Sequence, residues 1–348
     1  MKVLGIETSC DDSACSVVED GTTVLSYALS SQIDIHSKTG GVVPEVAARE
    51  HILNILPVLD QSLSSAGLSW DDIDAIAVTK GPGLISSLII GTETASVISY
   101  VKNLPLIPVQ HIKGHIFSNW LDRKGDEPKF PLIVLTVSGG HNELILMRDY
   151  DDFEVLGETI DDAAGEAYDK VARILGLGYP GGPIISKMAL DGNPDKFDLP
   201  RSWMGKDNLN FSFSGLKTSI LNLFKDYIDK NNISSHLGLD PKFISDLSAS
   251  FQKACNEVLA KKLLIAFLKN PDVKEVHLAG GVSANQNLRF EIEKLFEGRI
   301  KFRYPVHIKY CTDNASMIAS AGYFLYKYYG EKKFERKFNI VPSTSFKI

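Results

Sequence analysis

The sequence predicts an α/β protein of two lobes that share one duplicated fold, with a ligand cleft between the lobes. The chain has 348 residues, which is more than one compact core usually holds. A strand–turn–strand pattern begins near residue 2 and occurs again near residue 131. Each half also contains a strand that runs into a glycine-rich turn and then a helix. Glycine lets the backbone approach a ligand closely, and free N–H groups at a helix start favour anions, so the paired turns indicate a nucleotide or phosphoryl ligand.

In the first half, residues 2–8 have the pattern of a strand, and the polar stretch Ser9–Ser13 follows them as a turn. A second strand is expected over Ala14–Glu19, which completes a hairpin. Further along, the apolar stretch Ala75–Thr79 predicts a strand. The turn Lys80–Gly83 follows it and leads into a helix.

The second half repeats this plan. The strand Pro131–Val137, the turn Ser138–His141 and the returning strand Glu143–Met147 form the matching hairpin. A third strand around Phe153–Leu156 is expected to extend the sheet. The strand-to-glycine-turn unit of this half combines the strand Glu275–Leu278 with the turn Ala279–Asn285.

Residues 161–175 predict a helix with Asp161 or Asp162 as its N-terminal cap. One face of this helix is apolar, and the opposite face is a polar stripe. A polar stripe is usually a solvated face, and it becomes functional only where it lines a cleft. The apolar face consists of Ala164, Tyr168, Val171 and Leu175, and the polar stripe of Asp162, Glu166, Asp169 and Arg173.

The composition is that of an ordinary globular protein, with 44% hydrophobic and 23% charged residues. No apolar run approaches the length of a membrane span, and no signal-type stretch opens the chain. Four cysteines without a CxxC pair favour a reducing compartment, so we expect a cytoplasmic protein. The net charge of −6 means that any nucleic-acid role requires a local basic patch or a basic partner.

His111 and His115 are four residues apart, so on a helix both imidazole rings can reach one ion. Asp313 can join them only if the fold brings it back across about two hundred residues. Two imidazoles and one carboxylate leave coordination positions open, as in a catalytic metal site. The alternative is that the histidine pair has only a surface or packing role.

Three familiar motifs are excluded. The stretch Gly176–Gly181 spells GxGxxG, but it follows a predicted helix, whereas the dinucleotide-binding motif follows a strand. No GxxxxGK[ST] string is present, which excludes a P-loop. Position 112 is Ile, so His111–His115 lacks the glutamate of a zinc peptidase HExxH motif.

Nine strings, from the first strand to about Gly322, together resemble the bacterial TsaD family of tRNA N6-adenosine threonylcarbamoyltransferases, once called glycoproteases or O-sialoglycoprotein endopeptidases. That family is part of the actin/hexokinase/Hsp70 superfamily, whose lobes have a ribonuclease H-like fold. The chain departs from relatives at Ser186, Ser86 and Ser96, where Asp, Gly and Lys are common. The strings are Glu7–Asp12, Gly81–Leu84, His111–His115, Val137–His141, Asp162–Lys170, Tyr179–Pro183, Phe211–Thr218, Ala279–Asn285 and Cys311–Ala315.

The resemblance implies transfer of a threonylcarbamoyl group from threonylcarbamoyl-adenylate to N6 of the adenosine just 3′ of the anticodon, position 37, with release of AMP. The acceptors are tRNAs that read codons beginning with A. The resemblance also implies one metal ion per subunit, Fe²⁺ or alternatively Zn²⁺, held by His111, His115 and Asp313. Asp11 and Asp12 are candidate catalytic carboxylates. The residues expected to hold the adenylate are Thr136, Val137, Ser138, Gly139, Gly140, Asp169, Gly182 and Asn285.

The resemblance implies three kinds of partner besides the adenylate. They are tRNA, a shorter TsaB-like paralogue of the same fold and a small TsaE-like P-loop ATPase. The helix after Gly83 carries Leu84, Ile85, Leu88 and Ile89, which either form a patch for the paralogue or are buried in the core.

The expected domains are an N-terminal lobe over residues 1–106, completed by a helix at about 313–330, and a C-terminal lobe over 107–312 that holds both sites. Residues 331–348 form a tail.

Other functions remain open on the residues alone. A sugar or small-molecule kinase of the same superfamily would account for the lobes and the glycine turns. It would leave His111 and His115 without a function. A chaperone-like nucleotide-binding module predicts nucleotide binding that is independent of metal. A metallopeptidase lacks the required glutamate.

Overall fold

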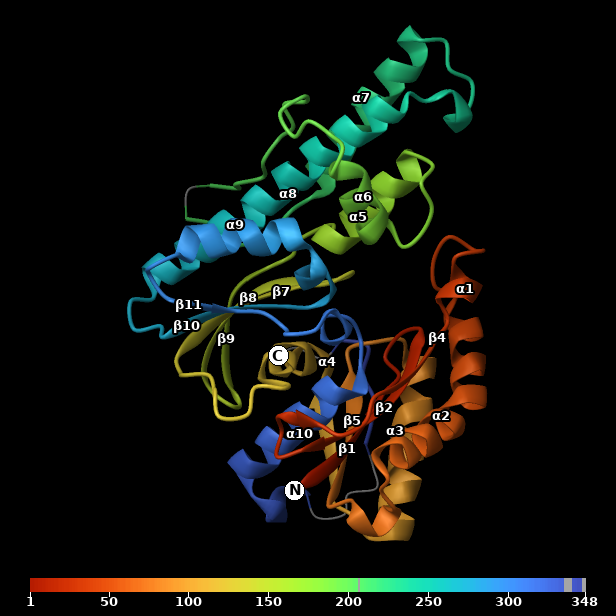
Figure 1. Ribbon diagram of the computed structural model, residues 1–348, viewed down its shortest axis with the longest axis vertical. Helices are drawn as coiled ribbons and strands as arrows, with labels where there is room; N and C mark the ends of the chain where they lie inside the picture. Colours follow the sequence, from red (N-terminus) through yellow and green to blue (C-terminus); the bar gives the residue numbers. More distant parts are fainter. Residues whose placement is uncertain (206, 335–339, 346–348) are drawn as a thin grey trace. The chain divides into compact units, whose positions relative to one another are not determined.

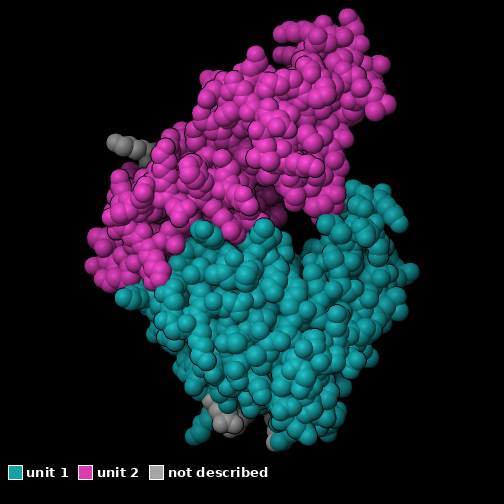
Figure 2. Space-filling view, viewed as in Figure 1, with its two compact units in different colours: residues 1–130, 147–153, 303–348 teal, residues 131–146, 154–302 magenta. Residues whose placement is uncertain are grey.

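The computed structural model describes residues 1–205, 207–334 and 340–345 and divides into two compact units (Figures 1 and 2). Unit 1 consists of Met1–Phe130, Met147–Phe153 and Arg303–Ile348, and unit 2 of Pro131–Leu146 and Glu154–Phe302. Within the described residues, no helix combines the length and apolar character that crossing a membrane requires.

Unit 1 is built on a six-stranded sheet with the strand order β3-β2-β1-β5-β6, in which β4 also pairs with β2. β1 and β2 form the expected antiparallel hairpin, and β5 and β6 continue the sheet in parallel. The strands are β1 Lys2–Glu7, β2 Asp12–Glu19, β3 Thr23–Val24, β4 Ala28–Ser31, β5 Ala75–Gly81 and β6 Leu106–Gln110.

The alternation of side chains along β1 determines which helices cover each face of this sheet. Leu4 and Ile6 point into a core shared with residues of α2 and α3. Gly5 points the other way, onto α10, where a Cβ atom at this position would lie 2.1 Å from the carbonyl oxygen of Ala315. The helices of unit 1 are α1 Ile33–His36, α2 Pro44–Ala66, α3 Ile85–Lys102, α4 His111–Phe117 and α10 Ala315–Tyr329 (Figure 1).

Unit 2 contains a five-stranded sheet with the order β9-β8-β7-β10-β11, which matches the order β3-β2-β1-β5-β6 of unit 1 strand for strand. This shared topology confirms the predicted duplication and the α/β class. The strands are β7 Leu132–Val137, β8 Asn142–Asp149, β9 Asp152–Glu158, β10 Glu275–Ala279 and β11 Lys301–Arg303. The helices are α5 Ala164–Ile174, α6 Gly181–Ala189, α7 Ser214–Lys230, α8 Pro241–Lys269 and α9 Gln286–Phe296.

One expectation about the helix at 161–175 is wrong. The helix begins at Ala164, and its N-cap residue is Ala163, which provides no side-chain cap. Asp161 instead accepts hydrogen bonds from the backbone N–H groups of Phe213 and Ser214 at the start of α7. The local pattern assigned the Asp161 carboxylate to the helix that directly follows it, but N–H groups more than fifty residues away along the chain bind it instead.

Residues 107–130 were expected in the C-terminal lobe, with a boundary at 106/107, but the structure assigns them differently. They belong to unit 1, because β6 pairs with β5 and α4 packs on α10. Of the expected tail, residues 335–339 and 346–348 lie outside the described part. The backbone N–H of Ser343 donates to the carbonyl oxygen of Lys80, at 3.0 Å, so the described tail residues contact the end of β5.

Candidate functional site

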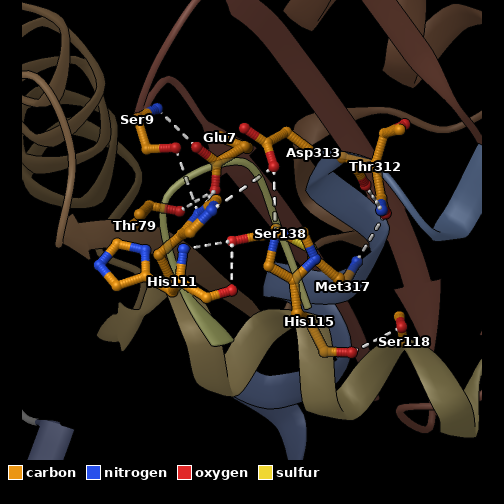
Figure 3. Close-up of polar contacts among 12 residues, drawn as sticks. Glu7, Ser9, Thr79, His111, His115, Ser118, Ser138, Thr312, Asp313 and Met317 are labelled. Atoms are coloured by element: carbon orange, nitrogen blue, oxygen red, sulfur yellow. Dashed lines mark hydrogen bonds and ion pairs between the residues drawn. The ribbon is translucent and has the colours of Figure 1, made fainter. Parts of the chain in front are cut away.

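The helix that carries both histidines begins where β6 ends. Gln110 closes the strand, and its side chain accepts a hydrogen bond from the backbone N–H of Lys113 at 2.8 Å, which caps the helix start. His111 and His115 are one turn apart on the same face, and their ring centroids are 4.7 Å apart (Figure 3). The predicted i,i+4 arrangement of the two rings is therefore present.

Asp313 reaches the histidines because α10 packs closely on α4. The side chain of Asn314 caps α10 by accepting from the backbone N–H of Met317 at 2.9 Å, so Asp313 lies just before the N-cap of this helix. Gly114 faces α10, and a Cβ atom there would lie 2.7 Å from Cδ1 of Ile318. A glycine between the two histidines thus permits the short distance between the helices.

The three side chains converge on one point within unit 1. Oδ1 of Asp313 lies 3.5 Å from Nε2 of His111 and 3.2 Å from Nε2 of His115 (Figure 3). Two donors that each lie about 2.1 Å from a tetrahedral ion are roughly 3.4 Å apart, so both distances suit donors of one ion. All three donor atoms lie within 4.8 Å of one another. The triad therefore has the donor types and the spacing to hold a metal ion.

The electrostatics of the triad also favour a cation. Burial lowers the pKa of His111, but Glu7 and Asp313 raise it, and the net pKa lies well above the ordinary value. Burial raises the pKa of Asp313, while His111 and His115 hold it well below its usual range. Two ionised carboxylates thus face His111, and they favour positive charge at the site, whether from a proton or a metal ion.

Of the candidate catalytic residues, Asp12 is the first residue of β2 and Asp11 directly precedes it, in the same unit. Burial, with smaller contributions from Asp313, Asp11 and Glu7, raises the pKa of Asp12 to about 7. Among the described residues, Oδ1 of Asp12 is buried without a hydrogen-bond partner. Asp12 therefore has the pKa of a group that exchanges protons near neutral pH.

The residues predicted to hold the adenylate are all in unit 2. Thr136 and Val137 end β7 and are buried, whereas Gly139 and Gly140 are exposed. The carbonyl oxygens of Ser138 and Gly139 accept from the backbone N–H groups of Gly165 and Glu166, so this turn packs on the start of α5.

Asp169 links α5 to the next helix. Its Oδ1 accepts from the backbone N–H of Gly181 at 2.7 Å, at the start of α6. Burial raises the pKa of Asp169. Gly182 is open, since a Cβ atom there would meet nothing within 4 Å. The structure therefore brings Asp169 and the glycine-containing stretch Tyr179–Pro183 together.

Asn285 caps α9 through Oδ1, which accepts from the backbone N–H of Leu288 at 3.1 Å. Its Nδ2 donates toward Gln252 at 3.0 Å, the hydroxyl of Tyr168 at 3.2 Å and Ser186 at 3.4 Å. No sequence pattern indicated that Gln252 and Ser186 are partners of Asn285. Tyr168 was predicted only as part of an apolar stripe. Its hydroxyl group could have indicated a polar partner, because a buried tyrosine hydroxyl is usually hydrogen-bonded.

Comparison with solved structures shows the fold. Component A of (R)-2-hydroxyglutaryl-CoA dehydratase from Acidaminococcus fermentans matches with a TM-score of 0.51 at 16% identity and covers 93% of this chain and 98% of its own. Full-length HypF, in a phosphate- and nucleotide-bound form, matches with a TM-score of 0.56 at 14% identity and covers 94% of this chain and 46% of its own. These matches and the duplicated topology confirm the predicted actin-like fold class.

Fold and triad together define an actin-like protein with a His-His-Asp group that could hold a metal ion. The sequence model of the TsaD family, tRNA N6-adenosine threonylcarbamoyltransferase, matches residues 23–320. A relative of that name from Thermomicrobium roseum is 49% identical over 340 residues, covering 93% of this chain and 92% of its own length. One from Bacillus subtilis is 49% identical over 325 residues, covering 92% and 90%. The chain belongs to this family of transferases, which confirms the family and the enzyme class predicted from the sequence.

Proposed function

We propose that this protein transfers the threonylcarbamoyl group of threonylcarbamoyl-adenylate to N6 of adenosine 37 in tRNAs that read codons beginning with A. The family match over residues 23–320 carries this proposal. Because the acceptor is tRNA, the reaction would take place in the cytoplasm. The kinase alternative has no comparable support, since the relatives bear the name of the transferase.

The transfer replaces one bond at the carbonyl carbon of the donor. The N6 amine attacks this carbon, the bond to the phosphate oxygen breaks, and AMP leaves while the amine loses a proton. His111, His115 and Asp313 would hold the metal, Fe²⁺ or Zn²⁺, which when bound supplies a Lewis acid for the donor oxygens. Asp12 would accept the proton, because a base with a pKa of about 7 is matched to neutral pH. Asp11, beside it, is the second candidate carboxylate.

The adenylate would bind to unit 2. Of the turn from Thr136 to Gly140, the exposed Gly139 and Gly140 would offer backbone N–H groups to the phosphate, and Asp169 would offer a carboxylate to the ribose hydroxyls. Gly182 leaves room for the ligand. Asn285 has three oxygen partners for the two N–H groups of its amide, so one contact is available for exchange with the adenylate.

A non-hydrolysable adenylate analogue tests this assignment by calorimetry. Asp169→Ala should lose a charged hydrogen bond of about 1.5–3 kcal/mol, which weakens binding roughly 10- to 150-fold. Glu166→Ala, less than one turn away on the same helix, is the matched control and should bind normally. Both variants should keep the metal content of the wild type. Unchanged analogue affinity in Asp169→Ala would exclude Asp169 from the site.

An apolar surface on α2 and α3 supports docking of the TsaB-like paralogue. Leu88 is buried, but Ile85 and Ile89, which we expected either in a patch or in the core, are 45% and 44% exposed. α2 and α3 pack against each other, and further apolar side chains extend the exposed surface over both helices. They are Ile52, Leu53, Leu56, Val97, Tyr100 and Val101.

The docking proposal is tested with the purified paralogue. Leu53→Glu combined with Val97→Glu should weaken the complex at least tenfold, because two charges would be buried at an apolar interface. Leu237→Glu is the control, since Leu237 is an exposed leucine of unit 2. Equal binding by the double variant and the wild type would rule out this surface.

The function itself is tested by transfer to unmodified tRNA. The assay includes the adenylate donor, with and without the paralogue and the TsaE-like ATPase, at several salt concentrations. We expect threonylcarbamoyl-adenosine only when the partners are present, because a net charge of −6 provides no general attraction for tRNA phosphates. No product under any combination, together with phosphorylation of a sugar, would overturn the proposal in favour of a kinase.

A further inference from the structure

Next to the His-His-Asp triad, on the Nδ1 side of His111, lies a buried carboxylate that the sequence pattern did not single out. Glu7 is the last residue of β1, and its side chain is fully buried. Oε1 accepts from the backbone N–H of Ser9 at 2.5 Å, and Oε2 accepts from Oγ1 of Thr79 at 2.5 Å. Oε2 also lies 3.1 Å from Nδ1 of His111 (Figure 3). A buried carboxylate with three donors is held in one orientation.

This contact determines which nitrogen of His111 is available to the metal. If Nδ1 donates its proton to Glu7, the neutral ring carries its lone pair on Nε2, and Nε2 is the atom that faces Asp313. Metal-binding histidines commonly donate their second N–H group to a carboxylate, which orients the ring and raises its basicity. The other acceptor near Nδ1 is the hydroxyl of Ser9, at 3.2 Å, which is uncharged and therefore the weaker partner.

His115 provides an internal comparison. Its Nε2 lies 3.2 Å from Asp313, but its Nδ1 is buried without a hydrogen-bond partner among the described residues. The two histidines are therefore not equivalent. Nδ1 of His111 faces a carboxylate, whereas Nδ1 of His115 faces none among the described residues.

We infer that Glu7 is a positioning residue of the metal centre, which acts through His111 by fixing its tautomer and ring orientation. This inference rests on the proposed metal site of the transferase. Glu7 contacts Nδ1 of His111, whereas Asp313 faces Nε2, and Thr79 and Ser9 hold Glu7 in place. Removing the charge of Glu7 should therefore weaken metal binding without removing a ligand.

Glu7→Gln is the main variant, because it keeps the size of the side chain and removes its charge. Zn²⁺ affinity is measured by competition with a chelator in the absence of donor and tRNA. The dissociation constant should rise about 10- to 100-fold, the usual effect of losing such a partner. In a His111→Ala background the same change should have no further effect, because Glu7 acts through that ring. A loss of affinity that persists without His111 would overturn the inference.

The matched control is a second buried carboxylate–histidine pair. Oε2 of Glu275 lies 3.1 Å from Nε2 of His277, and both side chains are buried within unit 2. Glu275→Gln should reduce the stability of the protein and leave Zn²⁺ affinity at the wild-type value. Equal losses of affinity in Glu7→Gln and Glu275→Gln would show a general effect of destabilisation and would refute the specific role.

A measurement on the unaltered protein covers the case in which Glu7→Gln fails to fold. Nitrogen NMR of the zinc-loaded wild type should show His111 with a protonated Nδ1 and a metal-bound Nε2. Coordination through Nδ1 would overturn the inference, even if tRNA modification is intact. Absence of Zn²⁺ binding by the wild type would instead reject the proposed metal site, so the two failures are distinguishable.

Discussion

Substitution of Gly114 by alanine should separate the two histidines from Asp313. The added Cβ atom would lie 2.7 Å from Cδ1 of Ile318 and 3.2 Å from Cγ of Met317. Carbon atoms pack at about 3.5–4.0 Å, so α4 must move by roughly 0.8 Å or Ile318 must leave its rotamer. Overpacking costs about 1–3 kcal/mol, and the better helix propensity of alanine offsets about 1 kcal/mol. The net destabilisation should be about 0–2 kcal/mol.

Gly114→Ala should reduce the affinity for metal more than it reduces the stability of the fold. Metal sites tolerate ligand displacements of only about 0.2 Å, so a loss of 1–2 kcal/mol in binding is expected, which is roughly 5- to 30-fold in affinity. Zn²⁺ competition with a chelator measures the affinity, and thermal unfolding measures the stability. Ile318→Val removes the clashing Cδ1 atom, so the double variant should recover most of the affinity. Wild-type affinity in Gly114→Ala, or no recovery in the double variant, would refute the argument that close packing assembles the triad.

Three further predictions concern protons and the glycine turn of unit 2. Zn²⁺ and a proton compete for Nε2 of His111, whose pKa is raised, so affinity should increase by up to about tenfold per pH unit and level off above that pKa; calorimetry in buffers of different ionisation enthalpy should detect the released proton. The folded-state pKa of Asp12, about 7, is above its unfolded value of about 4, so its contribution to stability is complete below pH 4 and is lost as the pH rises through 7. Asp12→Asn should therefore stabilise the chelated protein more at pH 8 than at pH 5, by roughly 2–3 kcal/mol in denaturant titrations, and an equal effect at both pH values would contradict the assigned pKa. Gly280→Ala should abolish binding of the adenylate analogue and spare the metal, because Gly280 has φ +85° and its Cβ atom would lie 2.5 Å from the carbonyl oxygen of Val137; retained binding would show that the turn is not part of the pocket.

Local patterns in the sequence determined the elements and the chemistry of the metal ligands. The apolar runs of β1 and β7, each followed by a polar turn and a second strand, predicted both hairpins. The spacing of His111 and His115 placed two imidazoles on one helical face, and the glycine turns after β5 and β10 indicated the duplication. All these features depend on residues that are close in the chain, so periodicity and turn chemistry are sufficient to predict them.

Only the tertiary structure decided which distant groups meet. Asp161 caps a helix that begins 53 residues later, whereas the local pattern assigned it to its own helix. Glu7 lies 104 residues from His111, and nothing around Glu7 in the sequence indicates that its carboxylate orients an imidazole. A charged residue at the end of a strand has many potential partners, and which of them it meets depends on how the helices and the sheet pack. For the same reason Asp313 meets the two histidines only because α10 packs against α4 at Gly114.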